Sequence, residues 1–242
     1  MGRTTEGECL AKDPDGVSYL LRKWCEGREC NTASWDEILR SADILASLHG
    51  AMNQMEHSLT EVLDTDAGRL LRTYEKHTRE LRTVRNYTRG RKNKSEFEKE
   101  FLGLYPKFEE QASEILESLR EQERKKEGMG ICHGDFNQHN VVFRSEYAAV
   151  ISFDNICYDV QIGDLARFMR KILEKNNWNM GLGMEMIRAY SDKKAMSPYE
   201  TKQLYLRLAY PEKFWKIANH YYNANKAWGF GRYLEKLEKI KA

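Results

Sequence analysis

No apolar stretch of the sequence is long enough to span a bilayer, and the amino terminus lacks the apolar core of a secretory signal. Neither sign of charge dominates, because 39 lysine and arginine residues stand against 37 aspartate and glutamate residues, which leaves a net charge of +2. Such a balance gives no general attraction to nucleic acid or to membrane surfaces. The sequence therefore predicts a protein made and retained in the cytoplasm, with neither a membrane nor a nucleic acid as a partner.

Cysteine pairs of the kind that hold metals or build disulfide frameworks are also missing. The five cysteines are scattered without a C-x-x-C pair, and their odd number leaves at least one unpaired in any intramolecular scheme. We expect most of them to be small core residues in a reducing compartment. They are Cys9, Cys25, Cys30, Cys132 and Cys157. A chain of 242 residues is long enough to bury a substantial core.

What the sequence does contain is a chemical pattern in residues 131–154, ICHGDFNQHNVVFRSEYAAVISFD. His133, Asp135 and Asn140 form an H-x-D-x-x-x-x-N pattern ahead of two predicted strands, 141–143 and 149–153, with a polar turn at 144–146. Phosphoryl transfer needs a carboxylate near the attacking hydroxyl and an amide oxygen for magnesium, and kinase catalytic loops space them this way. The alternative is a surface loop in which the Asp and Asn side chains cap turns.

This segment resembles the catalytic loop of the aminoglycoside phosphotransferase and choline kinase superfamily, in which HGDxxxxN precedes a strand that ends in a metal-binding aspartate motif. More closely, the chain resembles CotS-type spore coat proteins, a bacterial branch of that superfamily. The resemblance covers nearly the whole chain. It extends through residues 19–30, which look like the interlobe hinge, and through residues 45–49, 81–108 and 160–171.

The resemblance implies a fold of the α+β class, predominantly helical, with a protein-kinase-like C-lobe of the aminoglycoside phosphotransferase type. Residues 1–30 would hold a remnant strand pair of the N-lobe, with its turn at Asp15-Gly16, and the hinge. Residues 31–242 would form the helical C-lobe, including the catalytic-loop hairpin at 131–154.

The resemblance also assigns roles to individual residues. In an active member ATP and Mg²⁺ would be the cofactors, Asp135 the base and His133 a support of the loop. Asn140 and Asp154 would hold the metal, and Asp164 would brace the catalytic loop through hydrogen bonds. The residues expected on the nucleotide side of the hinge are Trp24, Glu26 and Gly27.

Two departures from the superfamily pattern argue against catalysis. Ser152 occupies the position of the usual magnesium-binding aspartate, and a neutral hydroxyl is a far poorer ligand than a carboxylate for this hard cation. The resemblance also begins partway through the small lobe, and neither Lys12 nor Lys23 lies where the phosphate-binding lysine is expected. Because electrostatic stabilisation of the phosphates is most of what a kinase contributes, both changes should lower the rate severely.

Two main functional hypotheses follow. The first is a degenerate kinase-like protein that acts as a structural or interaction component of the bacterial spore coat, made in the mother-cell cytoplasm and bound to other spore coat proteins. In that setting, exposed cysteines could crosslink within the coat. The second is an ATP-dependent phosphotransferase acting on a small hydroxyl acceptor. A third hypothesis, an inactive module that binds nucleotide, lies between them.

The remaining sequence predicts helical scaffold. A capping box at Ser34 opens a helix that reaches Gly50, in which His49 is expected to be a structural histidine. Two longer helices are predicted at about 59–88, with Gly90 ending the first, and at about 95–125. The seven basic residues between 79 and 94 precede a run of glutamates, so a solvated hairpin with neutralising charges is favoured over a docking site for an anionic partner.

Overall fold

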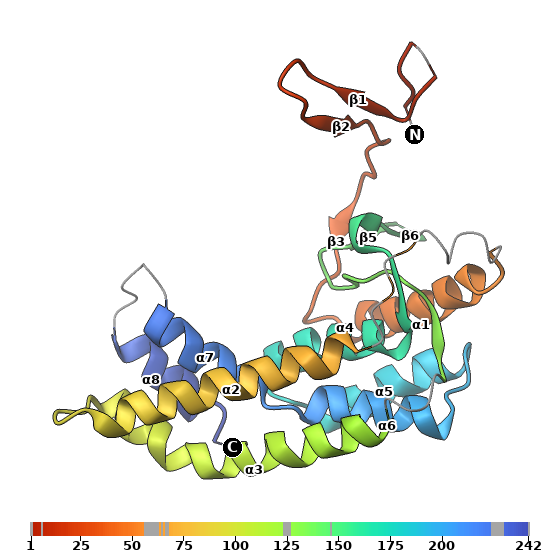
Figure 1. Cartoon of the computed structure of the whole chain (residues 1–242). Helices are drawn as coiled ribbons and strands as arrows, with labels where there is room; N and C mark the ends of the chain where they lie inside the picture. The colour runs from red at the N-terminus through yellow and green to blue at the C-terminus, as the bar shows by residue number, and fades with distance from the viewer. Residues whose placement is uncertain are drawn as a thin grey trace.

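The structure is a computed structural model, and it describes residues 2–5, 7–55, 63, 65, 68–122, 127–145, 147–223 and 230–241. The described chain is predominantly helical with three small antiparallel sheets, as predicted (Figure 1). The strands are β1 Leu10–Lys12, β2 Ser18–Leu20, β3 Arg28–Glu29, β4 Met129–Cys132, β5 Val141–Arg144, β6 Tyr147–Val150 and β7 Cys157–Val160. The helices are α1 Trp35–Met52, α2 Arg69–Gly90, α3 Glu96–Gln122, α4 Ile162–Lys175, α5 Met180–Ser191, α6 Pro198–Ala209, α7 Glu212–Asn223 and α8 Phe230–Glu238.

The predicted amino-terminal strand pair is present as β1 and β2, and Figure 1 shows it standing away from the helices on an extended connection. Its turn is built by Asp13, whose Oδ1 accepts hydrogen bonds from the backbone of Asp15 and Val17 at 3.0 and 2.9 Å. Gly16 closes the turn with φ +80°, a conformation that glycine adopts without steric cost. All six strand residues are exposed, so the pair is held by its own backbone bonds and turn rather than by a core.

The extended connection docks on the catalytic-loop hairpin at Gly27. A Cβ atom added there would lie 2.5 Å from a methyl group of Val142 and 2.6 Å from the carbonyl oxygen of Phe143, so only glycine permits this approach. Strand β3 follows at once and pairs antiparallel with β5, which pairs in turn with β6. The sheet therefore joins the segment before α1 to the hairpin that follows the catalytic loop.

Helix α1 begins as the sequence indicates, with the Ser34 side chain accepting a hydrogen bond from the backbone N–H of Glu37 at 3.4 Å. The reciprocal half of the predicted capping box is different. The Glu37 carboxylate accepts from the backbone of Asn31 at 2.9 Å and from Arg28 at 2.7 Å, which ties the helix start to β3. The helix continues past Gly50 to Met52.

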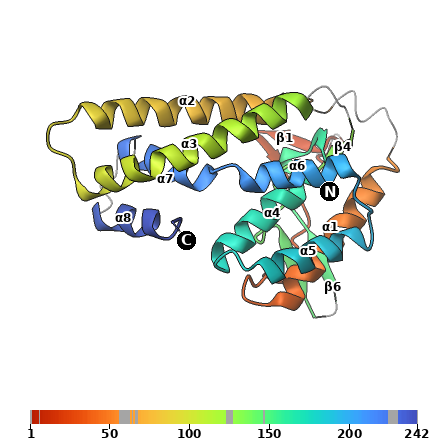
Figure 2. The same ribbon diagram turned by 90° about the horizontal axis from the view of Figure 1, so that it is seen from below.

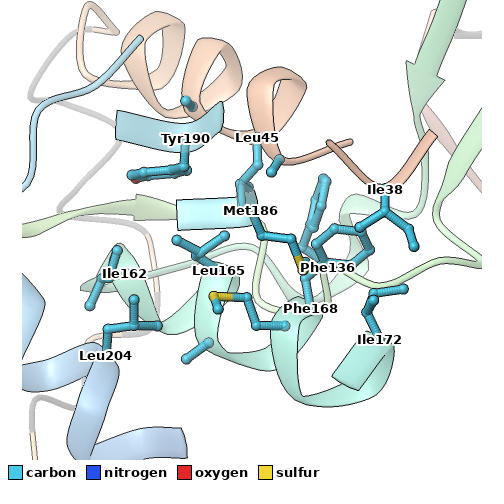
Figure 3. Packing of buried hydrophobic residues seen from close by; sticks show 14 of the residues in the cluster. Ile38, Leu45, Phe136, Ile162, Leu165, Phe168, Ile172, Met186, Tyr190 and Leu204 are labelled. Carbon is cyan, nitrogen blue, oxygen red and sulfur yellow. The ribbon is translucent and has the colours of Figure 1, made fainter. Parts of the chain in front are cut away.

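The main hydrophobic core lies where α1, α4 and α5 meet. Ile38 and Leu45 of α1 are fully buried against Leu165 and Phe168 of α4 and Met186 of α5, as Figure 3 shows. Phe136 enters the same cluster from the catalytic loop, and its ring packs edge-on against Phe168 with centroids 5.3 Å apart. The loop is therefore anchored in the core by one of its own residues.

Helices α2 and α3 form the predicted helical hairpin and run side by side in Figure 2. The prediction that the first helix includes Leu63 is wrong, because Leu63 lies in a bend and α2 begins at Arg69; the predicted start at 59 and the predicted end of the second helix at 125 lie outside the described residues. The hairpin carries the charge pairing that we expected. Arg82 lies 3.1 Å from Glu109, and Arg91 lies 2.6 Å from Glu98.

The cysteines follow the prediction only in part. Cys30 and Cys132 are buried, whereas Cys25 and Cys157 are half-buried and Cys9 is exposed on the strand pair, so the expectation that most are core residues is wrong. All five are free thiols. In the described part of the chain, no helix is both long and apolar enough to cross a membrane.

The buried carboxylate of Glu98 closes the start of α3 through a reciprocal cap. Its Oε2 accepts from the backbone N–H of Ser95 at 2.8 Å, and the Ser95 hydroxyl accepts from the Glu98 N–H at 3.2 Å. The other oxygen accepts from Arg91 at 2.6 Å and from the Tyr222 hydroxyl at 3.0 Å. Burial opposes ionisation, but these donors together hold the pKa of Glu98 below its usual value.

We predict that Glu98→Gln lowers the free energy of unfolding at pH 7 by about 2 kcal/mol, because the amide cannot accept all of these bonds. Since the folded-state pKa is lowered, the carboxylate's contribution is complete above the unfolded pKa and is lost as the pH falls through the folded pKa. Urea unfolding at pH 7 and at about pH 3 should therefore show a difference that shrinks on acidification. Glu96→Gln, in the same turn but exposed, is the control; equal effects of both changes would contradict the prediction.

Candidate active site

The catalytic loop lies between β4 and β5 and is braced by one buried carboxylate. Asp164, in the first turn of α4, accepts from the backbone N–H of His133 at 2.7 Å and from that of Gly134 at 3.0 Å. Its Oδ2 also lies 3.2 Å from Nε2 of His49. The loop is thus fixed to α4 and α1 at the two residues that precede Asp135.

His49 itself is a structural histidine, as predicted. It is fully buried, and its Nδ1 lies 2.8 Å from the hydroxyl of Tyr190 on α5. Donation from Nε2 to Asp164 and acceptance at Nδ1 from Tyr190 satisfy both ring nitrogens of a neutral imidazole. A buried hydrogen-bonded line therefore runs from α5 through α1 and α4 to the loop.

His133 supports the loop from within rather than facing the cavity. Its Nε2 donates to the carbonyl oxygen of Ile151 at 2.9 Å, and its Nδ1 accepts from the backbone N–H of Asp135 at 3.2 Å. The side chain is fully buried, between the rings of Phe136 and Phe153. Both nitrogens are engaged by backbone groups, so His133 does not serve as a proton acceptor for a substrate.

Asp135 and Asn140 are brought together, as a kinase-type loop requires. The Asn140 side-chain N–H group donates to the Asp135 carbonyl oxygen at 2.8 Å and to its carboxylate at 3.2 Å. Asn140 is nearly buried, whereas Asp135 is half-buried and lines a cavity. The arrangement orients the Asp135 carboxylate and leaves it accessible.

The segment after β6 differs from the predicted strand of residues 149–153. Strand β6 ends at Val150, because Ser152 has φ +64° in the left-handed region, which cannot continue an extended strand. Residues 153–155 then form a 3-10 turn against the loop. Gly134 permits this contact, since a Cβ atom there would overlap the carbonyl oxygen of Asn155. The loop and the turn can therefore pack this closely only because residue 134 is a glycine.

Of the two residues at the predicted metal position, Ser152 immediately precedes this turn and Asp154 lies in it. The Asp154 side chain is 60% exposed and its carboxylate lies 3.3 Å from Arg22 of the extended connection. Ser152 is half-buried and supplies only a hydroxyl. No group of three or more histidine, cysteine, aspartate or glutamate side chains among the described residues is placed to hold a metal ion. Of these two residues, only Asp154 offers a carboxylate oxygen of the kind that magnesium prefers.

The predicted hinge residues lie in the extended connection that leads into β3. Trp24 is 84% exposed, and Glu26 pairs with Arg144 at 2.9 Å. Gly27 makes the close approach to the hairpin described above. None of the three lines the cavity that contains Asp135.

A cavity of about 630 Å³ opens beside the loop and contains features that the sequence did not indicate. Its walls include Asp135 and Asp154 but also Arg69, Arg167 and Arg207, from α2, α4 and α6. The three arginines lie on three different helices and form no motif in the sequence. Their position at one cavity is therefore seen only in the folded structure.

The cavity wall also holds two thiols from paired strands. Cys132 and Cys157 lie directly opposite each other in the β4–β7 register. Hydrogen bonding to Cys157 and burial raise the pKa of Cys132, and the bond from Cys132 lowers the pKa of Cys157. Cys157 is therefore the more acidic thiol of the pair.

The sequence model of one protein family, described as "Spore coat putative kinase YutH", matches residues 4–242. The chain belongs to the YutH family. This agrees with the CotS-type resemblance inferred from the loop and hinge motifs. No curated protein sequence matches this YutH-family chain.

Solved structures similar to the YutH-family chain share its fold. An aminoglycoside phosphotransferase from Alicyclobacillus acidocaldarius superposes with a TM-score of 0.82 at 19% identity, over 99% of this chain and 71% of that one. Spectinomycin phosphotransferase APH(9)-Ia (0.58, 13%, 99% and 71%) and a choline/ethanolamine kinase family protein from Mesorhizobium loti (0.58, 14%, 97% and 71%) are also similar. The predicted kinase-like fold of the aminoglycoside phosphotransferase type is confirmed.

We predict that Asp164→Asn lowers the free energy of unfolding by about 3 kcal/mol, because the amide has one acceptor oxygen and its N–H₂ group would oppose a buried backbone donor. Amides 133–136 should also exchange with deuterium faster. Chemical unfolding and hydrogen exchange measure the two effects. Asp154→Asn, an exposed carboxylate beside the same loop, should change stability by less than about 0.5 kcal/mol. An Asp164 variant as stable as this control would contradict the bracing role.

Proposed function

We infer that the chain is a structural or interaction component of the bacterial spore coat, built on a kinase-like fold that does not transfer phosphate. The proposal rests mainly on Ser152. This residue places a hydroxyl at the position where an active enzyme needs a magnesium-binding carboxylate. The description of the YutH family supports the location in the coat. We further propose that the protein is made in the mother-cell cytoplasm and that its partners are other coat proteins.

The chemistry of phosphoryl transfer explains why Ser152 matters so much. The transferred group carries charge that metal ions neutralise, and the protein contributes mainly position and electrostatic stabilisation. Here the remaining acidic side chain of the turn, Asp154, is paired with Arg22. The hydrogen bonds that organise His133, Asp135 and Asn140 need no metal. A loop of this kind remains ordered in a protein without catalytic activity.

We predict that the chain fractionates with the coat of mature spores in the organism that encodes it, and that the Asp135→Ala variant does so to the same extent. A structural role does not need the candidate base, whereas a role that depends on catalysis does. Immunoblotting of coat extracts and spore lysates measures the distribution. A chain found only in the soluble lysate, or loss of coat association in Asp135→Ala with normal folding, would contradict the proposal.

The second candidate function is a small-molecule phosphotransferase. It is favoured by one observation: Asp135 and Asn140 keep the hydrogen-bonded geometry of a catalytic loop, and Asp135 faces a cavity. In this alternative Asp135 would be the base, Asn140 and Asp154 the metal residues, and ATP and Mg²⁺ the cofactors. An inactive module that binds nucleotide would share the same residues.

A thermal-unfolding titration with ATP and magnesium tests whether the chain binds nucleotide. Ligand at about a hundredfold above its dissociation constant stabilises the folded state by about 2.7 kcal/mol, which is readily seen. We predict no magnesium-dependent shift for the wild-type chain. A shift that is lost in Asp135→Ala and Asn140→Ala, but kept in the exposed control Asp192→Ala, would favour the phosphotransferase alternative and lead to a screen of acceptors.

A further inference from the structure

The cavity beside the catalytic loop combines two kinds of wall. Carboxylates come from the loop, the turn, β7 and α4, at Asp135, Asp154, Asp159 and Asp164, and guanidinium groups come from the helices, at Arg69, Arg167 and Arg207. Its volume of about 630 Å³ lies within the usual range for small-molecule sites. The cavity is therefore large enough for an organic ligand and has a basic wall for part of it.

Arg207 is held in place although one of its donors is unsatisfied. Its guanidinium group lies over Gly163 at the start of α4, where an added Cβ atom would be 3.2 Å from Nη1 and 3.3 Å from Cζ. Its Nε–H is buried and has no hydrogen-bond partner among the described residues. A buried donor without a partner is costly and calls for a physical reason.

The guanidinium groups of Arg167 and Arg207 are not engaged by a carboxylate. Neither side chain forms an ion pair with a residue in the ranges that the structure describes. Asp159, on β7, lines the same wall. Burial raises its pKa overall, although the charges of Arg207 and Arg69 act to lower it. Asp159 forms no ion pair with Arg167 or Arg207 in the described part of the chain.

The other buried carboxylate of the cavity is already in use. Asp164 accepts from His133, Gly134 and His49, so its lone pairs face the protein. Arg167 and Arg207 therefore remain without an ion-pair partner among the described residues, on the wall formed by α4 and α6. Arginine presents two parallel N–H groups that match the oxygens of a phosphate or carboxylate, and such charge-assisted bonds are strong.

We propose that this cavity binds a small organic molecule through an oxyanion, a phosphate ester or a carboxylate, that Arg167 and Arg207 hold against the helical wall. The proposal goes beyond the coat role, because binding of this kind needs neither magnesium nor turnover. It also specifies that the group bound by the two arginines is negatively charged. Asp135 then faces the uncharged part of the ligand rather than its anionic group.

Binding can be tested on the full chain without nucleotide or magnesium. Thermal midpoints and calorimetric titrations would be measured with inorganic phosphate, glycerol 3-phosphate and citrate at constant ionic strength, with glycerol and sodium chloride as the neutral and salt controls. We expect saturable binding of at least one of the organic anions, tighter than that of inorganic phosphate. Preference for glycerol 3-phosphate or for citrate identifies the anionic group as a phosphate or a carboxylate.

Variants locate the site. Arg167→Gln, an exposed position on α4, and Arg207→Gln should each weaken the affinity about tenfold or more, and the double variant should abolish binding. Arg207→Lys keeps the charge without the paired N–H groups and should lie between wild type and Arg207→Gln. Arg188→Gln on α5, whose side chain pairs with Glu185 outside the cavity, is the matched control and should bind as the wild type does.

Two results would overturn the proposal: no saturable binding of any of the three anions, or equal affinity in the folded double variant and the wild type. Circular dichroism of each variant establishes folding. Because the assay contains neither ATP nor magnesium, its failure leaves the coat proposal untouched, and a failure of the coat experiment leaves this one untouched.

Discussion

The carboxylate of Asp164 connects the helical lobe to the catalytic loop through buried hydrogen bonds. It lies in the first turn of α4 and accepts from two consecutive backbone groups of the loop, at His133 and Gly134. His49 and Tyr190 extend the same buried network into α1 and α5. Because buried polar groups need hydrogen-bond partners, this network favours the packing of α1, α4 and α5 that keeps all of its hydrogen bonds. Tyr190, at one end of this network, also belongs to the hydrophobic core of Figure 3.

The retention of His133, Asp135 and Asn140 has a structural explanation that is independent of chemistry. His133 joins the loop to the end of the hairpin through Ile151, and Asn140 closes the loop on Asp135. These bonds link protein groups to one another and contribute to the stability of the loop in this chain. A loop motif alone therefore distinguishes a kinase-like fold from other folds more reliably than it distinguishes an active kinase from an inactive relative.

The sequence allowed prediction of those parts of the fold that depend on local patterns. The loop motif, the hairpin and the start of α1 at Ser34 are local, and they were predicted correctly. The end of β6 was not, because alternation of apolar residues does not reveal that Ser152 adopts a left-handed conformation. Nor did the sequence indicate the cavity, since Arg167 and Arg207 lie 40 residues apart and meet only when α4 packs on α6.

The exposed strand pair β1–β2 has a thermodynamic consequence of its own. Its strands bury no side chains, and an isolated two-stranded hairpin is marginally stable in water. Opening of the pair is therefore a local fluctuation with a free energy far below that of global unfolding. Strengthening the helical core would slow unfolding of the lobe and leave this fluctuation unchanged. The hairpin can thus open while the helices remain folded.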